Sequence, residues 1–488
     1  MDHKLSRRDV IAASLAMGAA RPACPLQQAQ QPMPPMNREQ IYTDLRNAPR
    51  FVPTEGPNKP IGAGKGIFPG RVVWVHNPEV ARWDGVTEPR AVKSATGEWW
   101  DDANCDPAIA ARMVSTALRG LTGKESDKDA WDALFRHFNR TRLFGDAGYK
   151  PGEKIAIKFN FNNDRPAREG QPWPSGKGMP SPQVVHAVIR QLVEAAGIPG
   201  RDITMYDVAD GRYISDPVYL RIRGEKNREY QDITFMVNPR TAVLGQGRIA
   251  AVPDKSCPLR FSDPAVGLAY VPVPVVQAKY RINCCLFRAH DRAGVTLTAK
   301  NNFGSIYWVD GGQRETQADS NRKDYWGPRP VHQFVSKTKP MGSYNAFVDL
   351  VGFRHLGGKD VLYIIDGLYG AFECEANVIR YQSFNDHWTA SLFMSQDPIA
   401  IDSVGLDFIR NEPRCTPCGG RPDNFMHEAA LAGDPPSGVK YDPEQNGTRL
   451  SSLGVHEHWN NAEEKKYSRN LGRNEGIELV SLSAKQEG

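Results

Sequence analysis

Side chains capable of acid–base chemistry and ligand binding follow an apolar stretch at residues 282–287. This short run, rich in Cys, Leu and Phe, is typical of a strand that is buried on both faces. The ionisable or hydrogen-bonding residues that follow it include Arg288, His290, Thr298, Lys300 and Asn301. Open α/β sheets bind their ligands outside the carboxyl ends of the strands. We therefore expect a binding site here, the alternative being a solvated loop.

A second polar group lies in the segment 154–163, KIAIKFNFNN, which alternates apolar and polar residues. The period of two predicts a β-strand with Lys158, Asn160 and Asn162 on one face. A lysine beside two amides suits an anionic or carbonyl ligand, whereas a simple exposed face would be unusual in a parallel sheet. We assign acid–base roles to Lys158, His290 and Lys300. We assign substrate binding to Asn160, Asn162, Arg288, Thr298 and Asn301.

Four aspartates, each next to a predicted strand end or helix start, are candidate metal ligands. They are Asp207, Asp366, Asp397 and Asp402. Carboxylate oxygens bind Mg²⁺ and Ca²⁺, and zinc sites use them as well. Each aspartate also has a structural interpretation as a loop residue, turn former or helix cap. We expect them to share one rim and to hold a divalent metal: Mg²⁺, Ca²⁺ or Zn²⁺.

Two further motifs contain residue types that bind metals. In an extended segment His456 and His458 would share a face, a spacing that metal sites use, although the following Trp and Asn favour a structural turn. Cys415 and Cys418 form a Cys-x-x-Cys pair, whereas the adjacent Cys284 and Cys285 lie in the predicted buried strand. An iron–sulfur cluster needs four protein ligands, and the Cys-x-x-Cys pair supplies two, so we expect no iron–sulfur cluster. We favour a local disulfide between Cys415 and Cys418. A zinc site there would need two more ligands, for which Cys374 and His427 are candidates.

The elements that must position these residues predict an α/β fold with a mostly parallel, Rossmann-like sheet flanked by helices over residues 66–411. Strands are expected at 71–76, 154–163, 202–208, 282–287, 361–365 and 390–394, and helices at 106–121, 127–138, 182–196, 344–355 and 397–409. We expect an inserted subdomain at about 230–280 and a surface excursion at 310–340 that includes His332. For residues 412–488 we expect a loop-rich C-terminal extension.

The first 29 residues have the pattern of an export signal. Arg7 and Arg8 precede a mildly apolar run at 10–20, which is too short to span a bilayer. This predicts a Tat-type (twin-arginine) signal at 1–29, recognised by the Tat export machinery, with a Sec signal as the alternative. A Gln/Pro/Gly-rich linker or arm follows at 30–65. We therefore expect a periplasmic or secreted protein without a membrane span. The net charge of +5 is too small to predict nucleic-acid binding.

Three segments of the chain together resemble one known family. KFNFNN, TLTAKNNFG and DPIAIDSVG occur in the same order as the Lys-x-Asn, Thr/Lys-Asn-x-x-Gly and Asp-Pro-x-Ala-x-Asp segments of the DUF362 family. The resemblance covers about residues 154–411. It implies no reaction, because this family is named for having no assigned function.

The motifs of several large enzyme classes are absent from the sequence. It has no Gly-x-Ser-x-Gly elbow, Walker loop, His-Glu-x-x-His or Gly-x-Gly-x-x-Gly after a strand. Two functions are open. One is an exported enzyme that acts on an anionic or polyhydroxylated, carbohydrate-like small molecule in a cleft at the carboxyl edge of the sheet, with a divalent metal as candidate cofactor. The other is a non-catalytic periplasmic metal- or ligand-binding protein.

Overall fold

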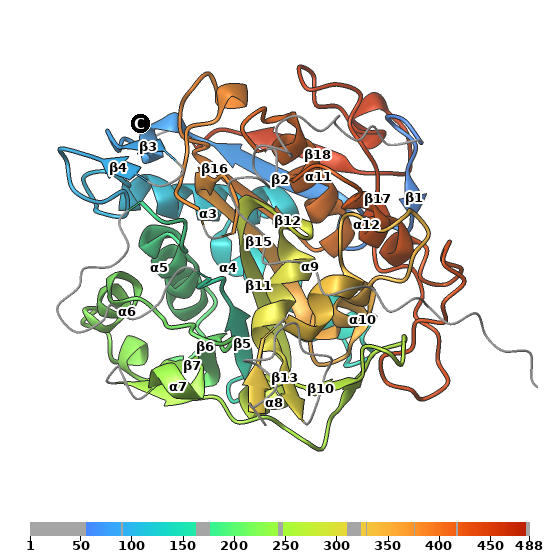
Figure 1. The fold of residues 1–488 in the computed structure, drawn as a ribbon. Helices are drawn as coiled ribbons and strands as arrows, with labels where there is room; N and C mark the ends of the chain where they lie inside the picture. The colour runs from blue at the N-terminus through green and yellow to red at the C-terminus, as the bar shows by residue number, and fades with distance from the viewer. Residues whose placement is uncertain are drawn as a thin grey trace, which may run out of the picture. The chain divides into compact units, whose positions relative to one another are not determined.

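A ten-stranded sheet runs through the protein in the order β18-β2-β16-β15-β11-β5-β6-β7-β8, with β12 paired to β11 (Figure 1). The strands are β2 (Arg71–His76), β5 (Ile155–Lys158), β6 (Ile203–Asp207), β7 (Thr234–Val237), β8 (Arg248–Ala250), β11 (Tyr280–His290), β12 (Gly294–Thr296), β15 (Asp360–Ala371), β16 (Ser391–Ser395) and β18 (Glu478–Leu482). From β15 to β8 all neighbours are parallel, whereas β16 runs antiparallel to both β15 and β2. The predicted mostly parallel α/β fold is confirmed.

The computed structural model describes residues 55–88, 91–162, 176–242, 247–309, 324–327, 329–374, 376–415 and 418–484. All of them belong to one compact unit, Leu45–Gly488. The predicted export signal and most of the predicted arm lie outside the described residues. Within the described ranges, no helix is long and apolar enough to cross a membrane.

Helices cover both faces of the sheet, and the alternation in β5 explains why two cores form. Ile155 and Ile157 point into one core, together with Phe159 and Phe161, whereas Ala156 points into the other. The first core contains residues of α3 (Pro107–Thr122), α4 (Asp127–Thr141), α5 (Pro182–Arg190) and α6 (Asp216–Arg223). The second contains residues of α9 (Thr298–Asn301), α10 (Ala346–Gly352), α11 (Pro398–Asn411) and α12 (Asp423–Ala430). Both faces are therefore apolar and buried, as expected for parallel strands.

Shorter elements complete the described fold. The remaining strands are β1 (Ile61–Gly62), β3 (Val86–Glu88), β4 (Ala91–Lys93), β9 (Leu259–Arg260), β10 (Leu268–Tyr270), β13 (Tyr307–Val309), β14 (Asp324–Trp326) and β17 (Val455–His456), and the remaining α-helices are α7 (Pro239–Ala242) and α8 (Val273–Gln277). Strands β9, β10, β13 and β14 form a small separate sheet, and β1 pairs with β17.

Two pairings of the main sheet bear on the predicted domain organisation. Strands β7 and β8, from within the predicted inserted region, extend the main sheet. The C-terminal extension also supplies a strand, since β18 pairs with β2 at the edge of the same sheet. These strands are short and partly exposed, which weakens the apolar pattern that would have revealed them.

A buried ion pair links the amino-terminal ends of two central strands. Arg281 in β11 and Asp360 in β15 are both fully buried, and the guanidinium donates two hydrogen bonds, of 2.6 and 2.7 Å, to the carboxylate. The same guanidinium donates to Oδ1 of Asn302, which follows α9. Charges in a protein interior require such compensation, because each one has lost its hydration.

Replacing Arg281 with Met should lower the free energy of unfolding by about 3–5 kcal/mol, because Asp360 would keep a buried charge without its partner. Denaturant unfolding measures this change. The double variant Arg281→Met/Asp360→Leu removes both charges and should be more stable than the single variant. Equal stability of the single and double variants would contradict a desolvation cost for the unpaired Asp360 carboxylate.

Candidate functional site

A cavity of about 290 Å³ lies at the carboxyl ends of β5, β6 and β11. The chain first adds β6, β7 and β8 outward from β5 and then returns to the other side of β5 with β11. Such a reversal of strand order leaves a crevice in which open α/β sheets bind ligands. The predicted residues that line it are Lys158, Asn160, Asn162, Asp207, His290, Lys300 and Asn301.

Lys158 forms the floor of the cavity and is almost completely buried. Its Nζ lies 3.1 Å from Oδ2 of Asp207 and donates a 3.0 Å hydrogen bond to Oδ1 of Asn301. The amide of Asn301 in turn donates to Asn283 Oδ1 and to the carbonyl of Cys284. Burial lowers the pKa of Lys158 to about 8, and the Asp207 carboxylate opposes this shift.

Gly304 allows this packing. A Cβ at this position would lie 2.2 Å from Oδ1 of Asp207 and 2.6 Å from Nζ of Lys158, so any side chain would displace the pair. In the TLTAKNNFG segment, Gly304 is therefore required for steric reasons, because it leaves space for the Lys158–Asp207 pair. Asn301 of the same segment stabilises the Lys158 ammonium by accepting its hydrogen bond.

Arg288 lies behind Asn160 and is fully buried. Its guanidinium donates to Oδ1 of Asn160 at 2.8 Å and to the carbonyl of Gly178 at 3.2 Å. Among the described residues no carboxylate forms an ion pair with it, and its Nε has no hydrogen-bond partner. Burial lowers the pKa of Arg288 to about 10, so it is charged at neutral pH. Arg288 thus orients Asn160 and adds positive charge behind the cavity.

Lys300 extends from α9 into the cavity. Its Nζ lies 3.5 Å from Nε2 of His332 and 4.6 Å from the centre of the Phe303 ring. Within the described part of the chain it forms no ion pair with a carboxylate. Burial lowers the pKa of Lys300 to about 8, with Arg212 and Arg288 adding to the effect.

The ring of His290 is held by the backbone that follows it. Its Nδ1 accepts hydrogen bonds from the backbone N–H groups of Arg292 and Ala293, at 3.0 and 3.2 Å. Burial lowers the pKa of His290 to about 3, and the Asp291 carboxylate, 3.0 Å from the same Nδ1, opposes this shift. His290 therefore lines the cavity as predicted, and its acid–base role stays a prediction.

Asp366, Asp397, Asp402 and Thr298 do not line the cavity, and the expected four-carboxylate rim is wrong. Asp366 accepts a hydrogen bond from the backbone N–H of Ser181, and Asp397 caps α11. Asp402 accepts hydrogen bonds from the N–H and hydroxyl of Thr298 and from the N–H of Ala299. These three carboxylates bind backbone donors that would otherwise be buried without partners, so of the four predicted aspartates only Asp207 lines the cavity.

Sequence reasoning missed Arg212, His332 and Cys374, which also line the cavity. Arg212 donates to the carbonyl of Asn162. His332 was expected on a surface excursion, and no apolar pattern in its segment indicated burial. Its ring instead packs 5.7 Å from that of His290 and against Phe303.

One group at the cavity has the donor types for a metal: His290, Asp291 and Cys374 lie close enough together to share an ion. However, Nδ1 of His290 already accepts a hydrogen bond, and Lys300, Arg212 and Arg288 surround the group with positive charge.

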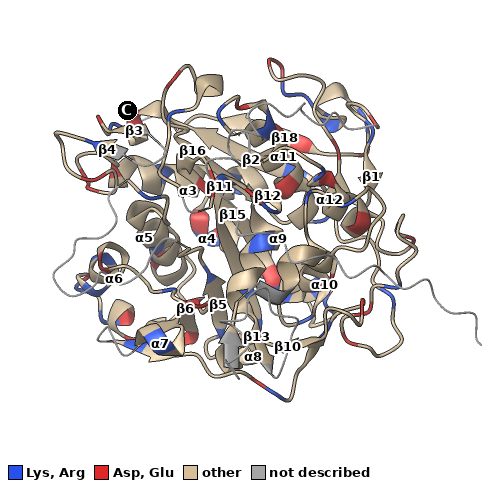
Figure 2. Cartoon of the chain, viewed as in Figure 1, with Lys and Arg blue, Asp and Glu red and all other residues tan. Residues whose placement is uncertain are grey.

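In Figure 2 the central strands are mostly uncharged, and Lys, Arg, Asp and Glu lie mainly on loops and outer elements. Buried basic groups in such surroundings favour an anion over a cation.

The chain is a mixed α/β protein with a polar cavity at the switch point of its sheet. The family model described as "Domain of unknown function (DUF362)" matches residues 155–407, more than half of the chain, and the protein belongs to this family. No curated protein matches the sequence. The matched region includes every residue of the cavity named above. Two of the three segments, KFNFNN and TLTAKNNFG, contribute residues to the cavity lining, whereas Asp402 of DPIAIDSVG binds the backbone at the start of α9.

Replacing Asp402 with Asn should lower the free energy of unfolding by about 2 kcal/mol, because the amide keeps one of the two acceptor oxygens that bind Thr298 and Ala299. Denaturant unfolding measures the loss. Asp106→Asn is a matched control, since Asp106 caps α3 through Oδ1, Asn caps equally well, and the ion pair of Oδ2 with Arg82 is long, at 3.5 Å, and exposed. Unchanged stability of Asp402→Asn would contradict the structural role.

Proposed function

We propose that the cavity binds a small molecule carrying a carboxylate or phosphate group, and that the protein is an enzyme that uses Lys300 to transfer a proton. The observation that carries this proposal is the pair of buried cations, Lys300 and Arg288, neither of which has a carboxylate ion-pair partner among the described residues. A buried charge is costly without a counter-ion, and an anionic ligand supplies one.

The other side chains of the cavity support a polar ligand. Asn160 and Asn162 offer amide groups, and the neutral His290 offers an N–H. A volume of about 290 Å³ suits a small metabolite rather than a polymer chain. Phosphate and carboxylate are recognised by the same basic and amide donors, so both belong to the proposed ligand class.

The pKa of Lys300 supports the catalytic part of the proposal. At a pKa of about 8 both the ammonium and the amine are populated near neutral pH. A general acid–base group works best when its pKa is near the operating pH. An exported enzyme, periplasmic or secreted after transport by the twin-arginine machinery, is the setting that we propose from the pattern at residues 1–29.

Replacing Lys300 with Met should weaken the binding of small phosphorylated or carboxylated compounds at least tenfold, a change of about 1.4 kcal/mol. The methionine keeps the length of the side chain and removes its charge. Calorimetric titration of a panel of such compounds, preceded by a thermal-shift screen, measures this loss, and any turnover found in the panel should also disappear.

Lys124→Met is the matched control, because Lys124 is exposed and lies between α3 and α4, away from the cavity. It should bind as the wild type does. Saturable binding that is unchanged in Lys300→Met would refute the proposed anion site. Binding that depends on Lys300 without turnover of any compound would favour a non-catalytic binding protein.

The affinity for an anionic ligand should fall as the pH rises from 7 to 9. Lys300 is mostly protonated below its pKa of about 8 and loses its positive charge above it. In Lys300→Arg the charge at this position persists, so the affinity should change less over the same range, and the remaining change would come from Lys158, whose pKa is also about 8. Titrations at a series of pH values test this. An affinity that stays constant or increases in the wild type would contradict the assignment.

A further inference from the structure

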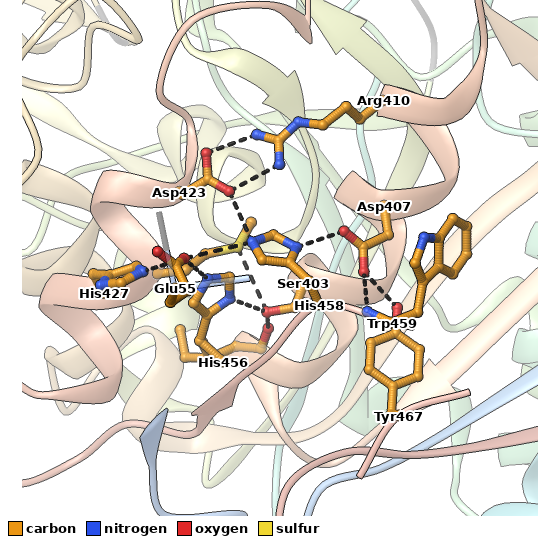
Figure 3. Close-up of polar contacts among 12 residues, drawn as sticks. Glu55, Ser403, Asp407, Arg410, Asp423, His427, His456, His458, Trp459 and Tyr467 are labelled. Atoms are coloured by element: carbon orange, nitrogen blue, oxygen red, sulfur yellow. Dashed lines mark hydrogen bonds and ion pairs between the residues drawn. The ribbon is translucent and has the colours of Figure 1, made fainter. Parts of the chain in front are cut away.

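A second polar cluster is buried far from the cavity in sequence, outside the family-matched region. It contains His456 in β17, His458 two residues later, and Glu55, which precedes β1 (Figure 3). The two imidazole rings lie 4.8 Å apart, and both face Glu55. His456 is 1% exposed and His458 6%.

The protonation of the His458 ring follows from its partner at Nδ1. That nitrogen lies 2.6 Å from Oδ1 of Asp407. The same carboxylate also accepts hydrogen bonds from the backbone N–H of Trp459 and the hydroxyl of Tyr467, which hold it in place. A carboxylate only accepts, so Nδ1 of His458 carries a proton. In the neutral ring, Nε2 then presents a lone pair.

His456 reaches the same state through a hydroxyl. Its Nδ1 lies 2.8 Å from Oγ of Ser403, and that hydroxyl also lies 2.7 Å from the carbonyl oxygen of Ile399. A carbonyl must accept, so the single hydroxyl proton of Ser403 goes to Ile399 and Nδ1 of His456 donates. Nε2 of His456 therefore also presents a lone pair.

Both Nε2 atoms face carboxylate oxygens without making a hydrogen bond. Each lies 3.7 Å from Oε1 of Glu55, and Nε2 of His458 lies 3.1 Å from Oδ1 of Asp423. Both are buried without a hydrogen-bond partner. A nitrogen lone pair and a carboxylate oxygen repel each other at these distances unless a cation lies between the two atoms.

We propose that Glu55, His456 and His458 bind one divalent transition-metal ion, with Zn²⁺ as the best fit. Ligand atoms at 2.0–2.1 Å from a tetrahedral zinc ion lie about 3.3 Å apart, close to the separations between Glu55 and the two rings. Two imidazoles and a carboxylate are donor types that zinc accepts. Asp423 or His427, both next to the three ligands, is placed to complete the coordination.

The surroundings of the cluster are those of a metal site. Asp407 and Ser403 hold the outer nitrogens of the two rings, which is how proteins orient metal-binding histidines. Arg410 neutralises Asp423 with hydrogen bonds of 3.0 and 2.7 Å.

The competing explanation is a proton in place of the metal. The carboxylates of Asp407 and Asp423 lie 2.6 and 3.1 Å from the two nitrogens of His458, so an imidazolium between them would satisfy this ring. It would not satisfy His456, whose Nε2 is buried without a hydrogen-bond partner, 3.7 Å from Oε1 of Glu55. A metal ion accounts for both rings, and a proton accounts for one.

The metal would have a structural role, because it would join parts of the chain that are distant in sequence. Glu55 lies just before β1, whereas the histidines lie in and after β17, and these two strands pair. Figure 1 shows β1, in blue, beside β17, in red. The bound ion would add coordination bonds to this small two-stranded sheet.

The test uses the full-length protein, stripped with a chelator and dialysed against ZnCl₂, with bound metal measured by mass spectrometry. We expect about one equivalent of zinc in the wild type and a melting temperature that rises with zinc concentration. His456→Gln and His458→Gln should lose the metal, and Asp407→Asn should bind it roughly 10–100-fold more weakly. His387→Gln, which alters an exposed histidine, should bind as the wild type does.

Cobalt(II) substitution in the wild type keeps the test decisive if a variant fails to fold. We expect weak ligand-field bands without thiolate-to-cobalt charge transfer, because no cysteine belongs to the cluster. A strong charge-transfer band that disappears in Cys374→Ser would move the metal to the cavity and overturn the proposal. Unchanged zinc binding in both histidine variants, or no binding in the wild type, would overturn it as well.

Discussion

The ammonium group of Lys158 holds three elements of the cavity in register. It contacts Asp207 at the end of β6 and Asn301 in α9 while belonging to β5, and Gly304 leaves the space that this requires. An ion so deeply buried is tolerated only with partners on several sides, so the three elements must meet in one arrangement. Lys300 is directed into the cavity because its neighbour Asn301 is fixed by this contact.

Much of the fold was predictable because burial leaves a simple signature in the sequence. The alternation in 154–163 correctly placed Ile155, Ile157, Phe159 and Phe161 together in one core, and Asp–Pro pairs marked the starts of α3 and α11. The same alternation, combined with the rule that ligands bind at strand ends, located Lys158, Asn160 and Asn162. Short edge strands such as β8 and β18 carry too few residues for such a pattern.

The carboxylates could not be assigned from sequence because capping and metal binding demand the same residue at the same kind of place. Asp397 and Asp402 occupy a helix start, where an aspartate either accepts backbone N–H groups or faces a ligand. Only the direction of the side chain separates the two, and that depends on segments distant in the chain. The same limit applied to His332, whose burial results from packing against Phe303 and His290.

The pairing of β18 with β2 has a consequence for biosynthesis. The strand that closes this edge of the sheet comes from the opposite end of the sequence, and its backbone groups bond to those of β2 along the whole of β18. While the chain is still on the ribosome, β2 has an open edge that could recruit other extended segments. Completion of the sheet must therefore wait until β18 has been synthesised, and a nascent polypeptide of this kind would benefit from a chaperone that covers that edge until then.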